Sequence, residues 1–349
     1  MYIRLLTLIC WFCLCFSCKQ GNESSAISTK NYVNIVKNDA QNRIDIFVDS
    51  VYFTSYLYAD SMLRKPVLFP LKTANGKRIT RGFPFKPIVG ERMDHPHHYG
   101  LWLNHGDVNG VDYWNSAVVP KNENARYGRI NHVEFLKMKS GGVGELSVKK
   151  NWVNDKQEIV IEEVTTYRFK GDKNVRSITC NSTLKAVSKN VIFTDSKEGM
   201  FAIRVRTELE MPSERIDKRF GVEVDSLVNI KPTGFYKNSN GIQGYPEVWG
   251  KRAKWMQLVG VVDDDSVAVS ILSHPKNPNH EPHWMARDYG LFAVNPLGSK
   301  TYTNGEEELN FSLKKDESIT FCYRVLIENG VVSSVRDIET QFLKFAENQ

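Results

Sequence analysis

Turn signals recur along this chain at intervals of roughly 8 to 14 residues, with no helical periodicity between them until the last stretch. The run RIDIFVD alternates Ile44, Ile46 and Val48 with polar residues, which predicts a strand with one buried face. Asn75-Gly76 between two such runs is a strong hairpin signal. Frequent short strands without intervening helices are typical of antiparallel proteins. The spacing therefore predicts an all-β, mostly antiparallel fold, arranged as a large β-sandwich or supersandwich.

The last residues have a different pattern. Ser334 and Asp337 form a capping-box-like start, and the apolar residues that follow are spaced by three and four positions. They are Val335, Ile338, Phe342 and Phe345. We expect one C-terminal helix that packs on the sheet through this stripe.

The N-terminus predicts export. Leu5 to Phe16 is an apolar run too short to span a bilayer as a helix, and it ends just before Cys18. This pattern predicts a lipoprotein signal peptide over residues 1–17 with lipidation at Cys18, and an ordinary secretory signal is the alternative. Residues 18–30 are polar and predict a flexible tether. The expected location is periplasmic or on the outer membrane, with membrane contact through the lipid anchor only.

The remaining chain, residues 31–349, is predicted to form a single β-sandwich domain with a long loop region at 212–255. Its 41% hydrophobic and 25% charged residues are typical of a globular protein. The net charge of +6 comes without a Lys/Arg-rich run, which argues against a nucleic-acid partner. Nucleotide-binding, serine-hydrolase and zincin motifs are absent from the sequence.

Histidines concentrate in two segments. Four of the eight lie between Glu91 and Ser116, in ERMDHPHHYGLWLNHGDVNGVDYWNS, and three lie in SHPKNPNHEPHW. Because scattered packing does not produce such clusters, we expect both segments to line one cleft. The stretch from Gly106 to Asp112 resembles a calcium loop but lacks the spacing and the final Glu of an EF-hand, so a turn is the better interpretation.

Pro96 favours extended backbone in HPHH, where His95 and His97 share a face about 6.6 Å apart. An H-x-H pair of this kind can bind a metal ion if a third ligand comes from elsewhere. His280, His283, Glu198 and Glu247 are candidates for that ligand. The alternative is that these imidazoles line a polar cleft without metal, so we predict no cofactor but keep a divalent metal at His95 and His97 as a possibility.

Aromatic and charged side chains accompany the histidines, and aromatic faces beside carboxylates and imidazoles suit sugar rings. Glu198 interrupts a strand-like run, and Glu247 lies beside two cations. The candidate catalytic residues are His97, His98, Glu198, Glu247 and His283. The candidate substrate-binding residues are His95, His105, Trp114, Trp249, Lys251, Arg252, His280, Arg287 and Asp288.

Several long motifs occur in order between residues 42 and 328: DHPHHYGLWLNHGDVNGVDYW, DSKEGMFAIRV, GYPEVWGKRAKW and HPKNPNHEPHWMARDYGLFAVNPLG. Together they resemble a large exported bacterial family of unknown function, often labelled PmoA or methane oxygenase. Membrane methane oxygenase subunits need hydrophobic spans, and the chain after residue 17 has none. The resemblance implies a β-sandwich similar to galactose-mutarotase-like proteins, in which His97, His98, His283 and Glu198 would be acid/base or substrate-binding groups.

These observations favour an exported carbohydrate-active enzyme, a lyase, epimerase or hydrolase that uses His/Glu acid–base catalysis on a sugar or oligosaccharide. One alternative is a non-catalytic glycan-binding lipoprotein. Another is a metal-dependent, cupin-like enzyme that uses His95 and His97.

Overall fold

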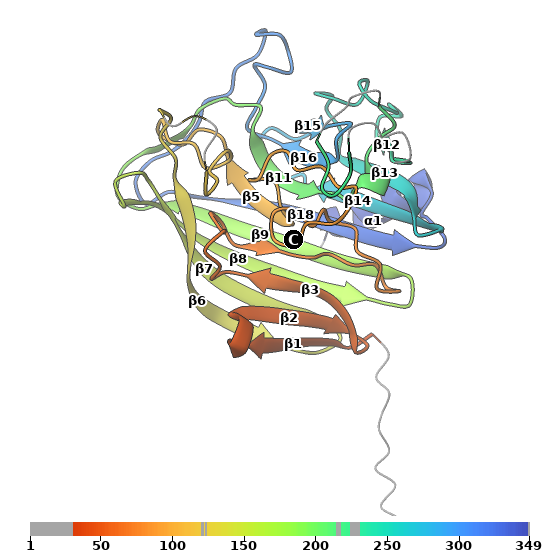
Figure 1. The fold of residues 1–349 in the computed structure, drawn as a ribbon. Helices are drawn as coiled ribbons and strands as arrows, with labels where there is room; N and C mark the ends of the chain where they lie inside the picture. The colour runs from red at the N-terminus through yellow and green to blue at the C-terminus, as the bar shows by residue number, and fades with distance from the viewer. Residues whose placement is uncertain (1–30, 120–121, 123, 214–217, 224–230, 348–349) are drawn as a thin grey trace, which may run out of the picture.

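The computed structural model describes residues 31–119, 122, 124–213, 218–223 and 231–347. These residues form two eight-stranded sheets that stack on each other, with a third pair of strands, β10 (Val191–Phe193) and β17 (Phe311–Leu313), at one side (Figure 1). The predicted signal peptide, Cys18 and the tether lie outside the described residues. Within the described part of the chain, no helix is long and apolar enough to cross a membrane.

The first sheet takes its strands mainly from the N-terminal half of the chain. In spatial order it contains β1 (Val33–Asn38), β2 (Arg43–Val48), β3 (Val51–Leu57), β4 (Val67–Leu68), β5 (Leu101–His105), β11 (Gly199–Arg204), β16 (Leu291–Asn295) and β15 (His283–Ala286). All of these neighbours pair antiparallel. Short 3-10 turns follow β1 (Asp39–Gln41) and β11 (Thr207–Leu209).

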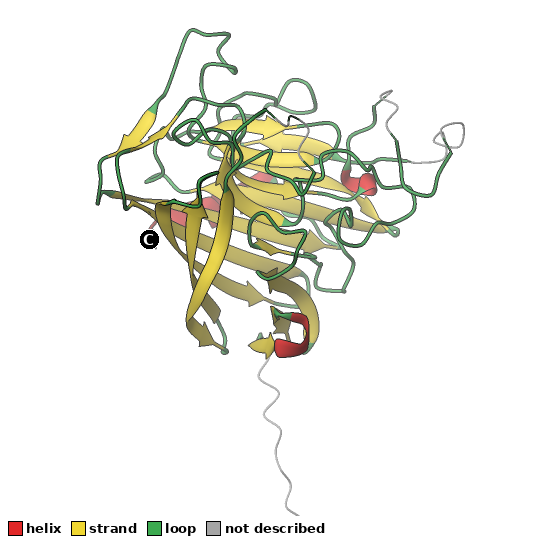
Figure 2. Ribbon diagram, turned by 60° about the vertical axis from the view of Figure 1, so that its left-hand side comes forward, coloured by secondary structure: helices red, strands yellow, loops and turns green. Residues whose placement is uncertain are grey.

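The second sheet is longer and equally antiparallel. In spatial order it contains β12 (Phe235–Asn238), β13 (Trp255–Val262), β14 (Asp265–Ser273), β18 (Ser318–Asn329), β9 (Val175–Ala186), β8 (Ile159–Gly171), β7 (Gly144–Val153) and β6 (Arg129–Lys139). Figure 2 shows how strands dominate the molecule. The largest buried apolar cluster takes residues from both sheets, so the prediction of an all-β, mostly antiparallel sandwich is confirmed.

Local sequence explains the strands and their turns. The side chains of Ile44, Ile46 and Val48 on β2 are fully buried, as their alternation predicts. The β13–β14 hairpin turns on Asp263 and Asp264, whose φ angles are 46° and 66°. Two successive left-handed residues twist a two-residue turn in the sense that antiparallel strands require, and Asp tolerates this conformation.

The single α-helix, α1 (Val335–Glu347), begins as predicted. The Ser334 hydroxyl donates to Asp337 at 2.6 Å, and the Asp337 carboxylate also accepts the backbone N–H of Ser334. Ile338, Phe342 and Phe345 are buried against the outer face of the second sheet, together with Trp255, Leu272, Cys322 and Leu326. Val335, expected in the same stripe, is 51% exposed because it lies at the first turn, beyond the edge of that contact.

The free thiols Cys180 and Cys322 lie on adjacent strands but face opposite sides of the second sheet. Cys180 belongs to the core between the sheets, and Cys322 lies under α1. Since successive side chains alternate across a sheet, neither thiol can reach the other through the backbone.

The outer face of the first sheet carries a second apolar cluster. In β5, Leu101 and Leu103 point into the core between the sheets, whereas Trp102 points outward. Ala202 on β11 and Ala293 on β16 face the same way as Trp102. Loops that leave these central strands fold back over this outer face, and they build the site described next.

Candidate active site

An open cleft of about 1020 Å³ lies over the outer face of the first sheet. Its walls come from the loop before β5, the loop after β5, the turn before β11 and the segment around β15. Polar and aromatic side chains line it, among them Asp94, His95, His97, His98, Asp112, Asn115, Tyr127, Lys197, Glu198, Arg287 and Tyr289. The first histidine-rich segment therefore borders the cleft, but the expectation that SHPKNPNHEPHW lines it too is wrong, because the chain reaches the cleft only after that segment, at Met285, Arg287 and Tyr289.

A buried ion-pair cluster fixes the HPHH segment. Arg81 and Arg204 are fully buried, and both donate to Asp94 Oδ1, at 2.6 and 2.7 Å. Arg81 also donates to the carbonyls of Asp94, His95 and His98. Burial raises the pKa of Asp94, but Arg204, the His95 hydrogen bond and Arg81 outweigh it and lower that pKa below its usual range. Asp94 is therefore ionised and holds this corner rigidly.

The HPHH backbone turns where extended chain was predicted. His95 adopts a φ of 42°, and the N–H of His98 donates to the carbonyl of His95 at 2.9 Å. Pro96 occupies the second position of this turn, where its fixed φ is favoured. The prediction that His95 and His97 share one face of a strand is wrong, because the turn and the Arg81 contacts outweigh the bias of the residue before proline towards extended backbone.

His95 is the best-oriented imidazole in the cleft. Its Nδ1 lies 2.8 Å from Asp94 Oδ2, and an ionised carboxylate only accepts, so Nδ1 carries the proton. Its ring is stacked between Tyr289 at 5.1 Å and His98 at 4.8 Å, within 5° of parallel to each. The other nitrogen, Nε2, is left with its lone pair and has no hydrogen-bond partner in the described chain. His95 can therefore take a proton from a ligand.

His98 lies beneath His95 and cannot exchange protons. Its Nε2 accepts the indole N–H of Trp114 at 3.1 Å, and its Nδ1 lies 3.4 Å from Arg204 Nη1. Both ring nitrogens thus face groups that only donate. Burial, followed by the neighbouring imidazoles and Arg204, lowers the pKa of His98 well below its ordinary value. The structure favours a supporting role for His98 and for Trp114, which are only 2% and 1% exposed.

His97 borders the cleft as a neutral group. Burial, followed by Lys65 and His95, lowers its pKa to about 2. Its ring makes no hydrogen bond to the residues that the structure describes. A group with so low a pKa is a poor base near pH 7, but it can still donate or accept a hydrogen bond to a ligand. The geometry therefore favours His97 as a ligand-binding group.

Lys65 supports His97 from below and was not singled out from the sequence. Its Nζ is 2.7 Å from the carbonyl of His97 and lies over the rings of Tyr99 and Trp102, at 4.4 and 5.1 Å from their centroids. The side chain is 2% exposed, and burial lowers its pKa from 10.5 to about 7. Lys65 follows Arg64 and precedes a strand, so the local sequence does not distinguish it from an exposed surface lysine.

The buried amine makes stability depend on pH in a specific window. Since the folded pKa of Lys65 lies below the unfolded value, the unfolded chain binds more protons between the two, and stability rises with pH from about 7 upwards. By pH 9 the gain relative to pH 6 is about 2–3 kcal/mol. We expect Lys65→Met, which keeps the packing on Tyr99 and Trp102, to lose this rise.

The measurement is the free energy of unfolding of both proteins, by chemical denaturation at pH 6 and pH 9. Because other groups titrate equally in both chains, the difference between the two proteins isolates Lys65. Parallel pH profiles for the wild type and Lys65→Met would contradict the prediction.

Glu198 is the carboxylate best placed for chemistry. It lies directly before β11, beside the end of the paired strand β5. The N–H of Gly106, which follows β5, donates to the backbone carbonyl of Glu198 at 2.7 Å. Its Oε1 pairs with Lys197, and its side chain is 21% exposed. Its Oε2 has no hydrogen-bond partner among the described residues. The predicted interruption of the strand at this position is confirmed, as a loop between β10 and β11 where a bulge was expected.

Asp112 is a second carboxylate in the cleft, and its oxygens are occupied. Oδ1 accepts the backbone N–H groups of Trp114 and Asn115, and Oδ2 accepts the Asn115 side chain at 2.8 Å. Burial raises the pKa of Asp112, hydrogen bonds from Asn115 and Trp114 lower it, and Glu198 raises it further. The loop that ends at Asp112 is a turn, as predicted, with Asn109 and Gly110 in left-handed conformation.

Arg287 brings a cation to the cleft. Its guanidinium lies over the ring of Trp249 at 4.8 Å, and its buried Nε has no hydrogen-bond partner. Trp249 packs edge-on against Tyr302, whose hydroxyl donates to the carbonyl of Lys197 at 2.8 Å. Tyr302 in turn stacks on His283 at 5.0 Å. Trp249 and His283, both predicted as site residues, thus lie outside the cleft lining and support Arg287 through this chain of ring contacts.

Residues 43–342 match the model of a protein family described as a family of unknown function, DUF6807. The chain belongs to this family. No protein in the set of curated proteins matches it. The family description names no activity, so it does not include the methane-oxygenase label.

Among solved structures, this DUF6807 member is similar to the GH36 α-galactosidase AgaA of Geobacillus stearothermophilus, with 10% identity over 85% of this chain and 40% of that one and a TM-score of 0.37. The α-galactosidase of Lactobacillus brevis is 10% identical over 90% of this chain and 41% of that one, with a TM-score of 0.36. A putative aldose 1-epimerase of Escherichia coli K12 is 11% identical over 86% of this chain and 99% of that one, with a TM-score of 0.30. The chain spans about 40% of the length of the two galactosidases, and these likenesses concern the path of the chain alone.

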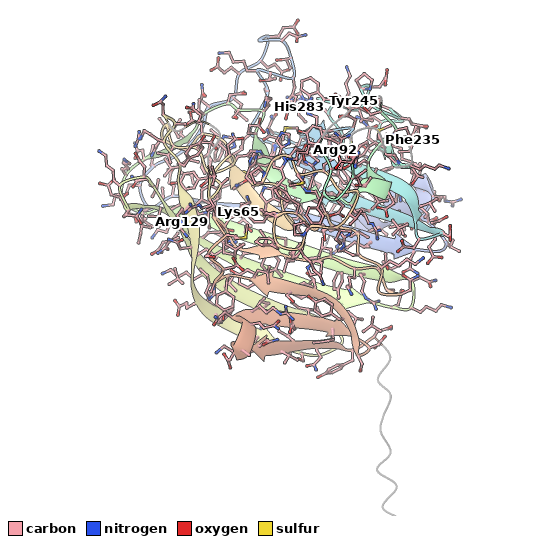
Figure 3. All side chains as sticks on the ribbon, viewed as in Figure 1. Lys65, Arg92, Arg129, Phe235, Tyr245 and His283 are labelled. Carbon is pink, nitrogen blue, oxygen red and sulfur yellow. The ribbon has the colours of Figure 1, made fainter. Side chains whose placement is uncertain are left out.

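The histidines of the second segment face away from the cleft in this DUF6807 member. His274 bonds to the carbonyl of Ala346 and packs on Phe345, and His280 stacks over Phe342 at 6.4 Å, both on α1. The Nδ1–H of His283 donates to the carbonyl of Gly250 at 2.7 Å, and its buried Nε2 has no hydrogen-bond partner among the described residues. Figure 3 shows His283 well apart from Lys65, which marks the HPHH turn. Helix α1 packs against this loop and binds its histidines, a contact that no local pattern in the chain indicates.

Other candidates lie outside the cleft lining. His105 is fully buried and bonds to the carbonyl of Thr194, Asp288 accepts from Ser213, and Arg252 ties together Asn279, Glu281 and Glu307. Lys251 and Glu247 are exposed on the loop before β13. Of the nine predicted substrate-binding residues, His95 and Arg287 border the cleft.

The metal alternative finds little support in the donor set. The described residues contain no group of three His, Cys, Asp or Glu side chains arranged to hold a metal ion. His95 Nδ1 is committed to Asp94, and none of the proposed third ligands from the second segment borders the cleft. His95 and His97 therefore fit a metal site poorly.

Proposed function

We propose that this protein is an exported carbohydrate-active enzyme that moves a proton on a sugar bound in the cleft. Supporting this is one observation: Glu198 and His95, both with an open proton-accepting atom, border the same polar cleft. Sugar hydroxyls suit the surrounding imidazoles and amides, and the ring of Tyr289 offers an apolar surface. The lipid anchor at Cys18 and a periplasmic or outer-membrane location belong to this proposal.

The carboxylates favour a lyase or an epimerase over a hydrolase. Glycoside hydrolases generally need two carboxyl groups that can each exchange protons or attack. Here the oxygens of Asp94 and Asp112 are taken by hydrogen bonds, which leaves Glu198 as the one available carboxylate among the three that border the cleft. A single carboxylate base with an imidazole in the same cleft suits abstraction of a C–H proton next to a carbonyl carbon.

The direct test is solvent deuterium incorporation. The protein is incubated in D₂O with a panel of oligosaccharides and monosaccharides, and the sugars are examined by mass spectrometry and NMR. We expect deuterium at one carbon of the accepted sugar, or an unsaturated product. A ligand that binds without exchange or product supports the glycan-binding alternative and overturns the enzymatic proposal.

His95 provides a variant with a matched control. We expect His95→Gln to lower the exchange rate about 10²-fold, because Gln keeps hydrogen bonding but accepts no proton. His280→Gln makes the same exchange in the loop between β14 and β15 that packs on α1, outside the cleft, and should leave the rate unchanged. Equal rates in all three proteins would remove His95 from the mechanism.

A further inference from the structure

The environment of Arg287 suggests what kind of sugar the cleft accepts. Within residues 31–119, 122, 124–213, 218–223 and 231–347, its guanidinium makes no ion pair and no hydrogen bond. Lys197, the other Lys or Arg side chain in the cleft lining, pairs with Glu198, and the buried Arg81 and Arg204 both pair with Asp94. A half-buried cation without a counterion is costly unless a ligand supplies one.

Arg287 and Glu198 lie close enough to influence the same groups, and yet they do not pair. Both act on the pKa of Tyr289 and on that of Tyr302, where Arg287 lowers and Glu198 raises the value. Two contacts keep them apart. Lys197 engages Glu198, and Trp249 holds the Arg287 guanidinium by its face. Because they do not pair with each other, Arg287 as a cation and Glu198 as a base can both act on one bound ligand.

The guanidinium is also preorganised. Trp249 covers one face of it, and Trp249 is itself fixed by Tyr302, which bonds to the carbonyl of Lys197. A fixed planar fork binds a carboxylate through two parallel N–H···O bonds and loses little side-chain freedom on doing so. The Arg287 guanidinium is therefore better suited to bind a planar carboxylate than a hydroxyl group.

From these observations we infer that the ligand is a sugar acid, whose carboxylate Arg287 binds. The inference rests on the proposed function and names its substrate class. In a uronate the carbon next to the carboxylate carries a C–H bond. When that bond breaks, the proton goes to Glu198 Oε2 and the electron pair goes into an enolate of the carboxylate, whose added charge Arg287 stabilises. If the enolate takes a proton from solvent on its other face, the product is the epimer. If it expels the oxygen substituent of the neighbouring carbon, that oxygen takes the proton back from Glu198 and leaves as an alcohol, and the product is unsaturated.

The test compares binding of acids with binding of their neutral esters. The probes are oligosaccharides of glucuronate, galacturonate and mannuronate, each beside its methyl ester, with affinities measured by calorimetry or saturation-transfer NMR. We expect at least one acid to bind about 10-fold to 100-fold more tightly than its ester. In Arg287→Gln this ratio should fall to near one, and Arg287→Lys should give an intermediate ratio.

Lys251→Gln is the matched control, since it removes an exposed cation outside the cleft, and it should keep the wild-type ratio. Melting curves of each variant establish that it is folded. Esters that bind as tightly as acids, acids that do not bind, or a ratio unchanged in Arg287→Gln would each overturn the inference. Deuterium exchange on a neutral sugar overturns it while leaving the proposed function intact. Arg287-dependent binding of an acid without any exchange or product would keep the sugar-acid ligand but overturn the proposed enzymatic function.

Discussion

Replacing Glu198 by Gln should lower the rate of proton exchange on the accepted sugar by about 10²–10⁴-fold. The amide keeps the size and hydrogen-bonding capacity of the side chain but has no basic oxygen to receive the proton. Because Glu198 borders the cleft with one oxygen free of partners in the described chain, ligand affinity should change far less than turnover. The measurement is kcat and KM for wild type and variant with the same sugar.

Glu247→Gln is the control for this experiment. Glu247 was an equal candidate from the sequence, but its side chain is exposed outside the cleft lining. We expect its kcat to match that of the wild type. If Glu247→Gln loses activity and Glu198→Gln does not, the assignment of the base is wrong.

The second large effect concerns stability. In Asp94→Asn the fully buried guanidinium groups of Arg81 and Arg204 lose their shared counterion, which should lower the free energy of unfolding by about 3–5 kcal/mol at pH 7. Asn keeps the shape of Asp, so the loss comes from charge and not from packing. His95 also loses the acceptor that fixes its tautomer. The measurement is chemical denaturation of both proteins.

The pH dependence of this effect follows from the lowered pKa of Asp94. Its ion pairs contribute fully above the unfolded pKa, near 3.8, and the contribution is lost as pH falls towards the lower folded value. The difference between the wild type and Asp94→Asn should thus be constant from pH 7 to about pH 5 and shrink in acid. Asp264→Asn, at an exposed hairpin position, should cost less than about 0.5 kcal/mol. A cost as small as this for Asp94→Asn would show that the cluster is not a structural anchor.

Local signals in the sequence were enough for the fold. The alternation in β2 and the Ser334–Asp337 cap each depend on residues within a few positions, and both occur as expected. The pairing of β5 with β11 and of β11 with β16 joins segments about a hundred residues apart, and local periodicity carries no information on such partners.

The site was harder to predict for the same reason. Of the two histidine clusters, the one before β5 borders the cleft, and the role of each imidazole depends on distant partners: Arg81 and Arg204 for the HPHH turn, Trp114 for His98, and α1 for His274 and His280. The adjacent pair Asp94-His95 was visible in the sequence, and a carboxylate beside a histidine could have suggested the pair that forms. Lys65 gave no such signal, since its burial arises from Tyr99 and Trp102 folding around it.

Apart from Met285 on β15, the cleft lining lies on connections that enter or leave strands of the first sheet, and the strands of the second sheet contribute no residue to it. Chemistry and mechanical support are thus divided between the two layers. Substitutions in β7, β8 and β9 can accumulate within the limits of core packing without touching the ligand. Conversely, exchanging the segments before β5 and after β15 offers a way to redirect sugar selectivity on an unchanged scaffold.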